Sequence, residues 1–90
     1  MRIRWTQAAI DDLCTINDYL TEHNPPLRQP TMRTLHQGIY ALRKFPNRGR
    51  AGTERGTRQL LFSRLPYIAV YRVEEDAVHV LRIYHGAQDR

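Results

Sequence analysis

The sequence predicts an α+β fold, in the order β-α-α-β-β-β, in which a helical hairpin packs on a small, mainly antiparallel sheet. Residues 57–85 are rich in β-branched and aromatic residues and are interrupted by short turns, as in consecutive strands. Two earlier segments repeat apolar residues at helical spacing, and residues 2–5 alternate in polarity before them. Elements grouped in this way form two layers, with the helices on one face of the sheet.

The first helix is expected from Gln7 to about His23, after a short strand at Arg2–Trp5. Thr6 is a favourable N-cap residue, and Asn24-Pro25-Pro26 stops the helix. One side of this helix is apolar and the opposite side is acidic. The apolar stripe is formed by Ala9, Leu13, Ile16 and Leu20, and the acidic side by Asp11, Asp12, Asp18 and Glu22.

A second helix is expected to end near Lys44, before Pro46. Pro30 is tolerated only near a helix start, so either the regular helix begins there or a turn at residues 26–29 is kinked onto it. The apolar stripe of this helix completes an antiparallel hairpin that must cover one face of the sheet. The stripe consists of Met32, Leu35, Ile39 and Leu42.

The rest of the chain is expected to form an exposed Gly- and Arg-rich loop, residues 47–56, and then three strands. The strands are Thr57–Ser63, Tyr67–Val73 and Ala77–His85. If Glu74–Asp76 is a three-residue hairpin loop, Val73 faces Ala77 and Tyr71 faces His79. One face then carries Tyr67, Ala69, Tyr71, Val73, Leu81, Ile83 and His85, and the other carries Ile68, Val70, Arg72, Val78, Val80, Arg82 and Tyr84. Both faces are half apolar, so the pattern leaves open which of them packs on the helices.

Size and charge favour one domain, residues 1–90, that gains stability from an acidic or nucleic-acid partner. The net charge is +5, and 13 of the 14 basic residues are Arg, which binds carboxylate and phosphate in planar, bidentate geometry. A GC-rich genome that encodes Arg in place of Lys would explain the same bias. The single Cys14 excludes an internal disulfide. Neither a signal peptide nor a long apolar run is recognisable, so the cytoplasm is the expected compartment and no membrane partner is expected.

Basic and aromatic residues of the strand region form the candidate site. They are Arg58, Arg64, Arg72, Arg82, Tyr84 and His85. Such a set could bind phosphate, and His with Arg can also cleave RNA by general acid–base chemistry. The alternative is a solvated sheet face with ordinary surface arginines. No nucleotide-binding, metal-binding or hydrolase motif occurs in the sequence, so neither a cofactor nor a metal is expected.

Short pieces spread over nearly the whole chain match one known family. They are Trp5, Asp12-Leu13, Ile16, Tyr19, Asn24-Pro25, Phe45-Pro46, Gly49-Arg50, Gly56-Thr57-Arg58, Pro66-Tyr67-Ile68, Val70-Tyr71-Arg72-Val73, Leu81-Arg82-Ile83 and His85-Gly86-Ala87-Gln88. Their order and spacing are specific together, although each piece alone is not. On these residues the chain resembles the RelE/ParE superfamily of toxins from bacterial type II toxin–antitoxin systems.

The resemblance implies a small cytoplasmic toxin that forms a hetero-oligomer with an antitoxin encoded beside it. In this family the antitoxin contacts operator DNA through its N-terminal part, and its C-terminal tail, disordered when free, wraps and neutralises the toxin. An acidic or amphipathic tail suits a basic toxin. Apolar residues of the two helical stripes, expected to be partly exposed, are the candidate antitoxin contacts: Leu13, Ile16, Leu20, Leu35 and Ile39.

The superfamily divides by target. RelE-like members cut messenger RNA in the ribosome, whereas ParE-like members poison DNA gyrase. Here Ile68 stands where the nucleases usually carry Arg, Gln88 stands where one branch has a second Arg, and only His85 coincides with a nuclease catalytic residue. The resemblance therefore favours gyrase as the target. One alternative is a degenerate toxin that acts only in operon regulation, and another is a ribosome-dependent mRNA endoribonuclease that uses His85, with phosphate held by Arg58, Arg72 or Arg82.

Overall fold

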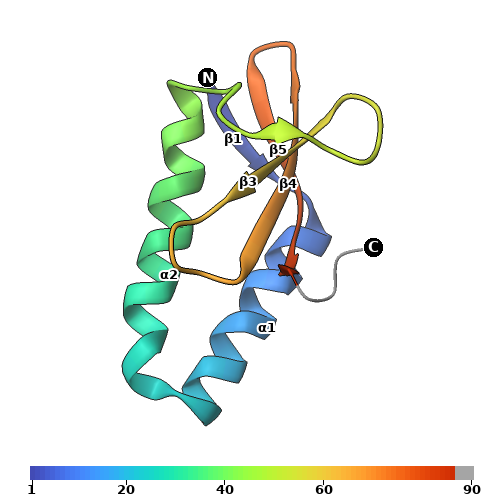
Figure 1. Ribbon diagram of the computed structural model, residues 1–90. Helices are drawn as coiled ribbons and strands as arrows, with labels where there is room; N and C mark the ends of the chain where they lie inside the picture. The colour runs from blue at the N-terminus through green and yellow to red at the C-terminus, as the bar shows by residue number, and fades with distance from the viewer. Residues whose placement is uncertain (87–90) are drawn as a thin grey trace.

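Two helices cover one face of a five-stranded mixed sheet (Figure 1). The computed structural model describes residues 1–86. The strand order is β1-β5-β4-β3-β2; β1 is parallel to β5, and the other neighbouring pairs are antiparallel. The predicted α+β fold is confirmed, and one further short strand, β2, lies in the segment predicted as a loop. The strands are β1 (Arg2–Trp5), β2 (Arg50–Ala51), β3 (Thr57–Leu61), β4 (Tyr67–Glu74) and β5 (Ala77–His85).

Helix α1 (Gln7–His23) has the predicted bounds, and Thr6 joins its start to the sheet. The Thr6 hydroxyl accepts a hydrogen bond from the Ala9 amide at 3.1 Å and donates one to the Leu81 carbonyl at 2.8 Å. The same side chain therefore caps the helix and fixes it against β5. Because β1 pairs only with the first half of β5, α1 covers the edge of the second half.

Helix α2 (Pro25–Tyr40) returns beside α1 and completes the predicted hairpin (Figure 1). It continues into a 3-10 turn, η1 (Ala41–Arg43), so the α-helix ends at Tyr40 and not near Lys44. In a 3-10 turn, side chains three positions apart lie nearly above one another. At the end of α2, side chains three positions apart are therefore brought into contact.

The second helix begins at Pro25 and runs through Pro30. It therefore starts earlier than the regular helix expected near Pro30, and residues 26–29 belong to the same α-helix. Pro30 has no N–H to donate to the carbonyl of Pro26, so that carbonyl loses its helical partner. Residues 21–30 are all exposed at the tip of the hairpin, where water solvates such a carbonyl.

The β4–β5 hairpin differs from the predicted register because its turn contains two residues, Glu75 and Asp76, instead of three. Glu75 has φ +55°, which tightens the turn. As a result Val73 pairs with Val78 and not with Ala77, and Tyr71 pairs with Val80 and not with His79. Val78 and Val80 therefore lie on the face opposite to the predicted one.

A β-bulge at Leu81 reverses this shift farther along the hairpin. Tyr71 pairs with Val80 and Val70 pairs with Arg82, so Leu81 is left as the extra residue. The short turn shifts the pairing by one residue, and the bulge shifts it back by one residue. Beyond the bulge, Ile83 and His85 therefore lie on the predicted face. Leu81 itself was wrongly placed as a regular member of that face.

The face of β4 that carries Ala69 and Tyr71 packs on the helices, which settles the choice that the sequence pattern left open. Tyr71, Leu35 and Leu42 are fully buried at its centre. The other core residues are Ala9, Ile16, Leu20, Ile39, Leu60, Phe62, Ala69, Val78, Val80 and Ile83. Neither helix in residues 1–86 has the length and apolar character needed to cross a membrane.

Candidate functional site

The sheet face opposite the helices, here named the outer face, carries most of the strand arginines. Side chains alternate between faces along a strand, so the pairing register places residues of neighbouring strands side by side. One row, from β2 to β5, is Arg50, Gln59, Val70 and Arg82, and the next, from β3 to β1, is Thr57, Arg72, His79 and Arg4. Both helices of the described chain lie on the other face (Figure 1).

Gln59 joins side chains from separate strands of the outer face. Arg50 Nε donates to Gln59 Oε1 at 3.1 Å, and Gln59 Nε2 donates to the Tyr84 hydroxyl at 3.4 Å. Gln59 is only 4% exposed, so both ends of its amide find protein partners where water has little access. One buried side chain therefore positions Arg50 and Tyr84 on either side of β4.

Arg82 is paired with Asp12 of α1. The Asp12 carboxylate accepts hydrogen bonds from Arg82 Nε at 2.8 Å and Nη2 at 3.1 Å, and also from the Ile83 amide at 2.8 Å. The hydrogen bonding of Arg82 to Asp12, together with the charge of Asp12, raises the pKa of Arg82 above its ordinary value. The third bond satisfies an edge N–H of β5 that β1 does not reach. The charge of Arg82 is therefore already compensated within the chain.

Arg72 passes close to the turn that precedes β3. Gly56 there has φ +82°, and a Cβ atom on it would lie 2.8 Å from a guanidinium nitrogen of Arg72. Glycine permits both the left-handed backbone and this close approach. Within residues 1–86 the ion pairs involve only Arg2 and Arg82, so no carboxylate neutralises Arg72. Its guanidinium donates a long hydrogen bond, of 3.5 Å, to the Arg55 carbonyl.

Arg58 lies on the helix side of the sheet and holds the loop before β2. Its guanidinium donates to the Gly49 carbonyl at 2.8 Å. The Tyr71 hydroxyl accepts a hydrogen bond from the Gly49 amide at 2.9 Å and donates one to the Pro46 carbonyl at 2.7 Å. Arg58 and Tyr71 together fix the backbone of this loop, which gives Arg58 a structural task on the face away from Arg72.

His85 also lies on the helix side, at the end of β5. Its ring meets the Tyr67 ring edge-on, with the centroids 5.7 Å apart. A hollow of about 450 Å³ between α1 and the ends of β4 and β5 is lined by His85, Tyr67, Tyr19 and Asp12, among others. Burial and, to a smaller extent, the charge of Tyr19 raise the pKa of Tyr67. Arg82 and Tyr84 line the same hollow, which therefore brings three of the predicted site residues together.

The six predicted site residues do not form one patch. Arg72 lies on the outer face, Arg58 lies on the helix side, and Arg64 is in the exposed β3–β4 turn with φ +66°. Arg82 and Tyr84 belong to the outer face by register and His85 to the helix side, but all three line the same hollow at the end of β5. The division follows from strand pleating, because the adjacent residues Tyr84 and His85 must point to opposite faces. Gln88 lies outside the described residues.

Other members of the outer face were missed by sequence reasoning: Arg4, Arg50, Gln59 and His79. Strand β2 has only two residues, which is too short for any periodic signal. The alternation of β1 and β3 was visible, but placing their side chains beside Arg72 required the register across the sheet. That register depends on turns and a bulge, as described above.

An apolar groove of about 390 Å³ opens between the two helices beside β1. Its exposed walls include Ile10 and Tyr40, which are 41% and 58% exposed. The expectation of partly exposed stripes on both helices is right for Leu13 only, because the remaining residues pack into the core: Ile16, Leu20, Leu35 and Ile39. The groove is lined by Ile3, Trp5, Ile10, Leu13, His36, Gln37, Ile39 and Tyr40.

The sequence of this chain is similar to toxins of type II toxin–antitoxin systems. A family model described as the ParE toxin of the type II toxin–antitoxin system, parDE, matches residues 3–90. Toxin RelE2 of Caulobacter vibrioides is 33% identical over 87 residues, which cover 97% of this chain and 97% of that protein.

Solved structures share the fold. A chain of the chromosomal ParDE toxin–antitoxin system from P. aeruginosa matches with a TM-score of 0.83 and 28% identity, covering 94% of this chain and 95% of that one. The intact E. coli RelBE toxin–antitoxin complex contains a chain that matches with a TM-score of 0.66 and 12% identity, over 99% of this chain and 98% of that one. At that identity the likeness concerns the fold alone. With the family model matching almost every residue, the chain belongs to the ParE toxin family of type II toxin–antitoxin systems.

Proposed function

We propose that this toxin arrests growth by inhibiting DNA gyrase and that an antitoxin encoded beside it neutralises it. The observation that carries the first part is the division of the expected nuclease residues between two sheet faces. His85 lies on the helix side, whereas Arg72 lies on the outer face. Arg82 lines the same hollow as His85, but its charge is paired with Asp12. General acid–base cleavage of RNA needs the acid or base within hydrogen-bond reach of the reacting group, beside the cations that hold the phosphate.

Ile68 supports the same choice. It stands where nucleases of the superfamily usually carry Arg, and it pairs across the outer face with Leu61 and Tyr84. Its side chain is 8% exposed and cannot hold a phosphate. The loss of one such cation removes transition-state stabilisation of about 3 kcal/mol, roughly a hundredfold in rate. Inhibition by binding is therefore favoured over RNA cleavage.

The apolar groove is the surface that we assign to the antitoxin tail. It lies next to the free edge of β1, and it shares Gln37 and Tyr40 with a neighbouring hollow that Arg43 and Lys44 line. Residues 23–53, which include α2 and the following loop, contain cations but no Asp or Glu. Such a groove suits an acidic, amphipathic segment that folds on binding. The resulting cytoplasmic hetero-oligomer would contact operator DNA through the antitoxin.

A supercoiling assay tests both parts. Purified toxin is expected to inhibit supercoiling of relaxed plasmid by gyrase, and an equimolar amount of antitoxin is expected to restore it. Ile10→Asp in the groove should keep the inhibition but weaken the rescue at least tenfold, because it buries an unpaired charge. Leu27→Asp is the matched control, since Leu27 is 50% exposed and lies outside the groove.

Fully active gyrase in the presence of toxin would contradict the gyrase proposal. Ribosome-dependent mRNA cleavage that His85→Ala abolishes would then establish the nuclease alternative. Inactivity in both assays, with operon repression intact, would instead establish a role in operon regulation alone. If Ile10→Asp and Leu27→Asp were rescued equally, the groove would not be the antitoxin site.

A further inference from the structure

The chain from Tyr40 to Arg48 contains two aromatic residues, each followed three positions later by an arginine. The guanidinium carbon of Arg43 lies 3.6 Å from the centroid of the Tyr40 ring, and that of Arg48 lies 5.0 Å from the centroid of the Phe45 ring. The Tyr40 and Phe45 side chains are 58% and 53% exposed. We name Tyr40, Arg43, Lys44, Phe45 and Arg48 the cation–aromatic patch.

Local backbone geometry produces both pairs. Tyr40 and Arg43 are joined by the 3-10 turn η1, which places side chains three apart above one another. Arg43 Nε also donates to the Tyr40 carbonyl at 3.3 Å. In the second pair, the Arg48 amide donates to the Phe45 carbonyl at 3.1 Å, which closes a similar turn. Each guanidinium is therefore held over a ring before any ligand arrives, and less side-chain freedom is lost on binding.

The cations of the patch have no carboxylate partner in residues 1–86, where the ion pairs involve only Arg2 and Arg82. The sequence contains no Asp or Glu from residue 23 to residue 53. The patch therefore carries uncompensated positive charge next to exposed ring faces. It is separate from the outer face, where Arg82 is paired with Asp12.

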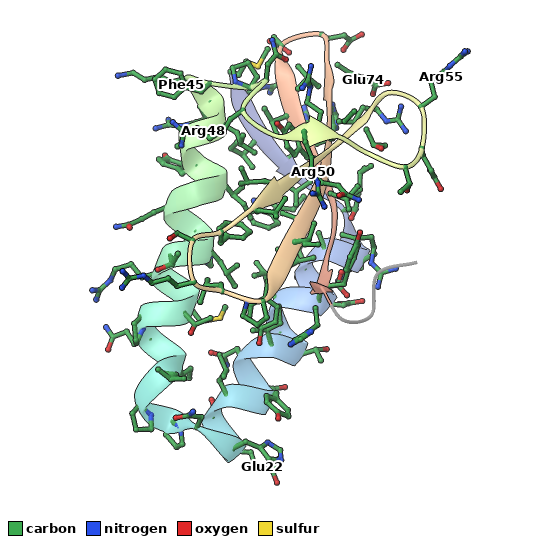
Figure 2. The ribbon with its side chains drawn as sticks, viewed as in Figure 1. Glu22, Phe45, Arg48, Arg50, Arg55 and Glu74 are labelled. Carbon is green, nitrogen blue, oxygen red and sulfur yellow. The ribbon has the colours of Figure 1, made fainter. Side chains whose placement is uncertain are left out.

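Two hollows meet at Lys44 and Phe45. One, of about 530 Å³, extends toward Tyr40 and Met1, and the other, of about 470 Å³, extends toward Arg48. Figure 2 shows Phe45 and Arg48 near the end of α2, on the side away from Arg55. A flat ligand can thus contact the ring of Phe45 while its charged groups reach cations on either side.

We propose that the cation–aromatic patch binds single-stranded nucleic acid, with phosphates on Arg43, Lys44 and Arg48 and an unpaired base stacked on Phe45. Arginine and lysine attract phosphate in any nucleic acid, but exposed aromatic rings gain contact only from bases that are unstacked from a partner strand. An acidic peptide would use the same cations without needing these rings. Because the groove assigned to the antitoxin tail adjoins the patch at Tyr40, the tail and the nucleic acid would compete for Arg43 and Lys44. The inference does not depend on gyrase being the target.

Fluorescence anisotropy of labelled oligothymidylate, oligouridylate and a DNA duplex with the purified full chain tests the proposal. We expect both single strands to bind more tightly than the duplex. Their affinity should fall with salt with a log–log slope of about −2, since three cations each displace about 0.7 counterions. The difference between the two single strands reports the combined preference of the patch for the sugar and for the thymine methyl group.

Paired variants separate stacking from charge. Phe45→Ala is expected to weaken binding about tenfold with an unchanged salt slope, because it removes a stacked base contact. Arg48→Ala is expected to weaken binding and to reduce the slope by about 0.7. The matched controls are Tyr19→Ala and Arg55→Ala, which alter an exposed aromatic residue and an exposed arginine outside the patch and should bind like the unaltered chain.

Three results would overturn the proposal. The first is unchanged binding by both Phe45→Ala and Arg48→Ala with folding intact by circular dichroism. The second is tighter binding of duplex together with no effect of Phe45→Ala, which would leave only general attraction to phosphate. The third is displacement of oligothymidylate by polyglutamate at equal charge, with loss of polyglutamate binding in Arg48→Ala but not in Phe45→Ala, which would assign the patch to an acidic protein.

Discussion

The two faces of the sheet share one backbone but hold their side chains in different ways. On the helix side, Tyr71 is fully buried and its hydroxyl makes two hydrogen bonds to loop backbone. On the outer face, the next residue, Arg72, remains partly exposed and has no carboxylate partner in the described chain. Adjacent positions of β4 therefore have different structural roles. One position stabilises the fold, and the other presents charge that a partner can use.

The largest expected effect on stability comes from removing Tyr71, the buried member of this pair. Tyr71→Ala should lower the free energy of unfolding by about 3–5 kcal/mol, because it leaves a cavity and removes the side chain that anchors the loop. Arg72→Ala, one residue away, should change it by no more than about 0.5 kcal/mol. Urea unfolding followed by circular dichroism measures both. Similar losses for the two variants would show that the outer face is also part of the stabilising core.

A smaller loss of stability is expected from substitutions at the contact between α1 and the edge of β5. Asp12→Ala should cost about 1–3 kcal/mol, because it removes a charged acceptor from the Ile83 amide as well as from Arg82. Arg82→Ala should cost less than about 1 kcal/mol, since Arg82 is largely exposed and Asp12 still caps the strand. Thermal unfolding of both variants tests this order. An equal loss would mean that the ion pair, and not the edge cap, provides the stabilisation.

The smallest expected effect is on the stability of the fold at alkaline pH. The pKa of Tyr67 is raised by burial and by Tyr19, so folding favours the neutral phenol. Its contribution is fully present below the unfolded pKa of about 10 and is lost as the pH rises through the folded value. Tyr67→Phe should therefore lose less stability than the unaltered chain between neutral pH and about pH 11. Identical stability curves would show that Tyr67 does not contribute to the alkaline transition.

Most of the fold was predictable from local patterns. The bounds of α1 follow from Thr6 and from the Asn-Pro-Pro break, and the order of helices and strands follows from their periodicity. The composition of the outer face was not predictable in the same way. Its rows depend on the two-residue turn at Glu75 and on the bulge at Leu81, and each of these changes which residues share a face. His85 was grouped with Arg72 and Arg82 in one candidate site on residue type alone, although strand alternation had already placed it on the opposite face.

The sequence by itself determined the α+β class, the helical hairpin, the excess of positive charge and the resemblance to RelE/ParE toxins, because these depend on composition, spacing and short motifs. The tertiary structure decided which face of β4 is buried, that Arg82 is paired with Asp12, and that the exposed apolar surface is the groove beside β1 and not the two helical stripes. The physical reason is that each of these features requires contacts between residues far apart in the chain. Strand register and helix docking set such contacts, and local sequence patterns do not encode them.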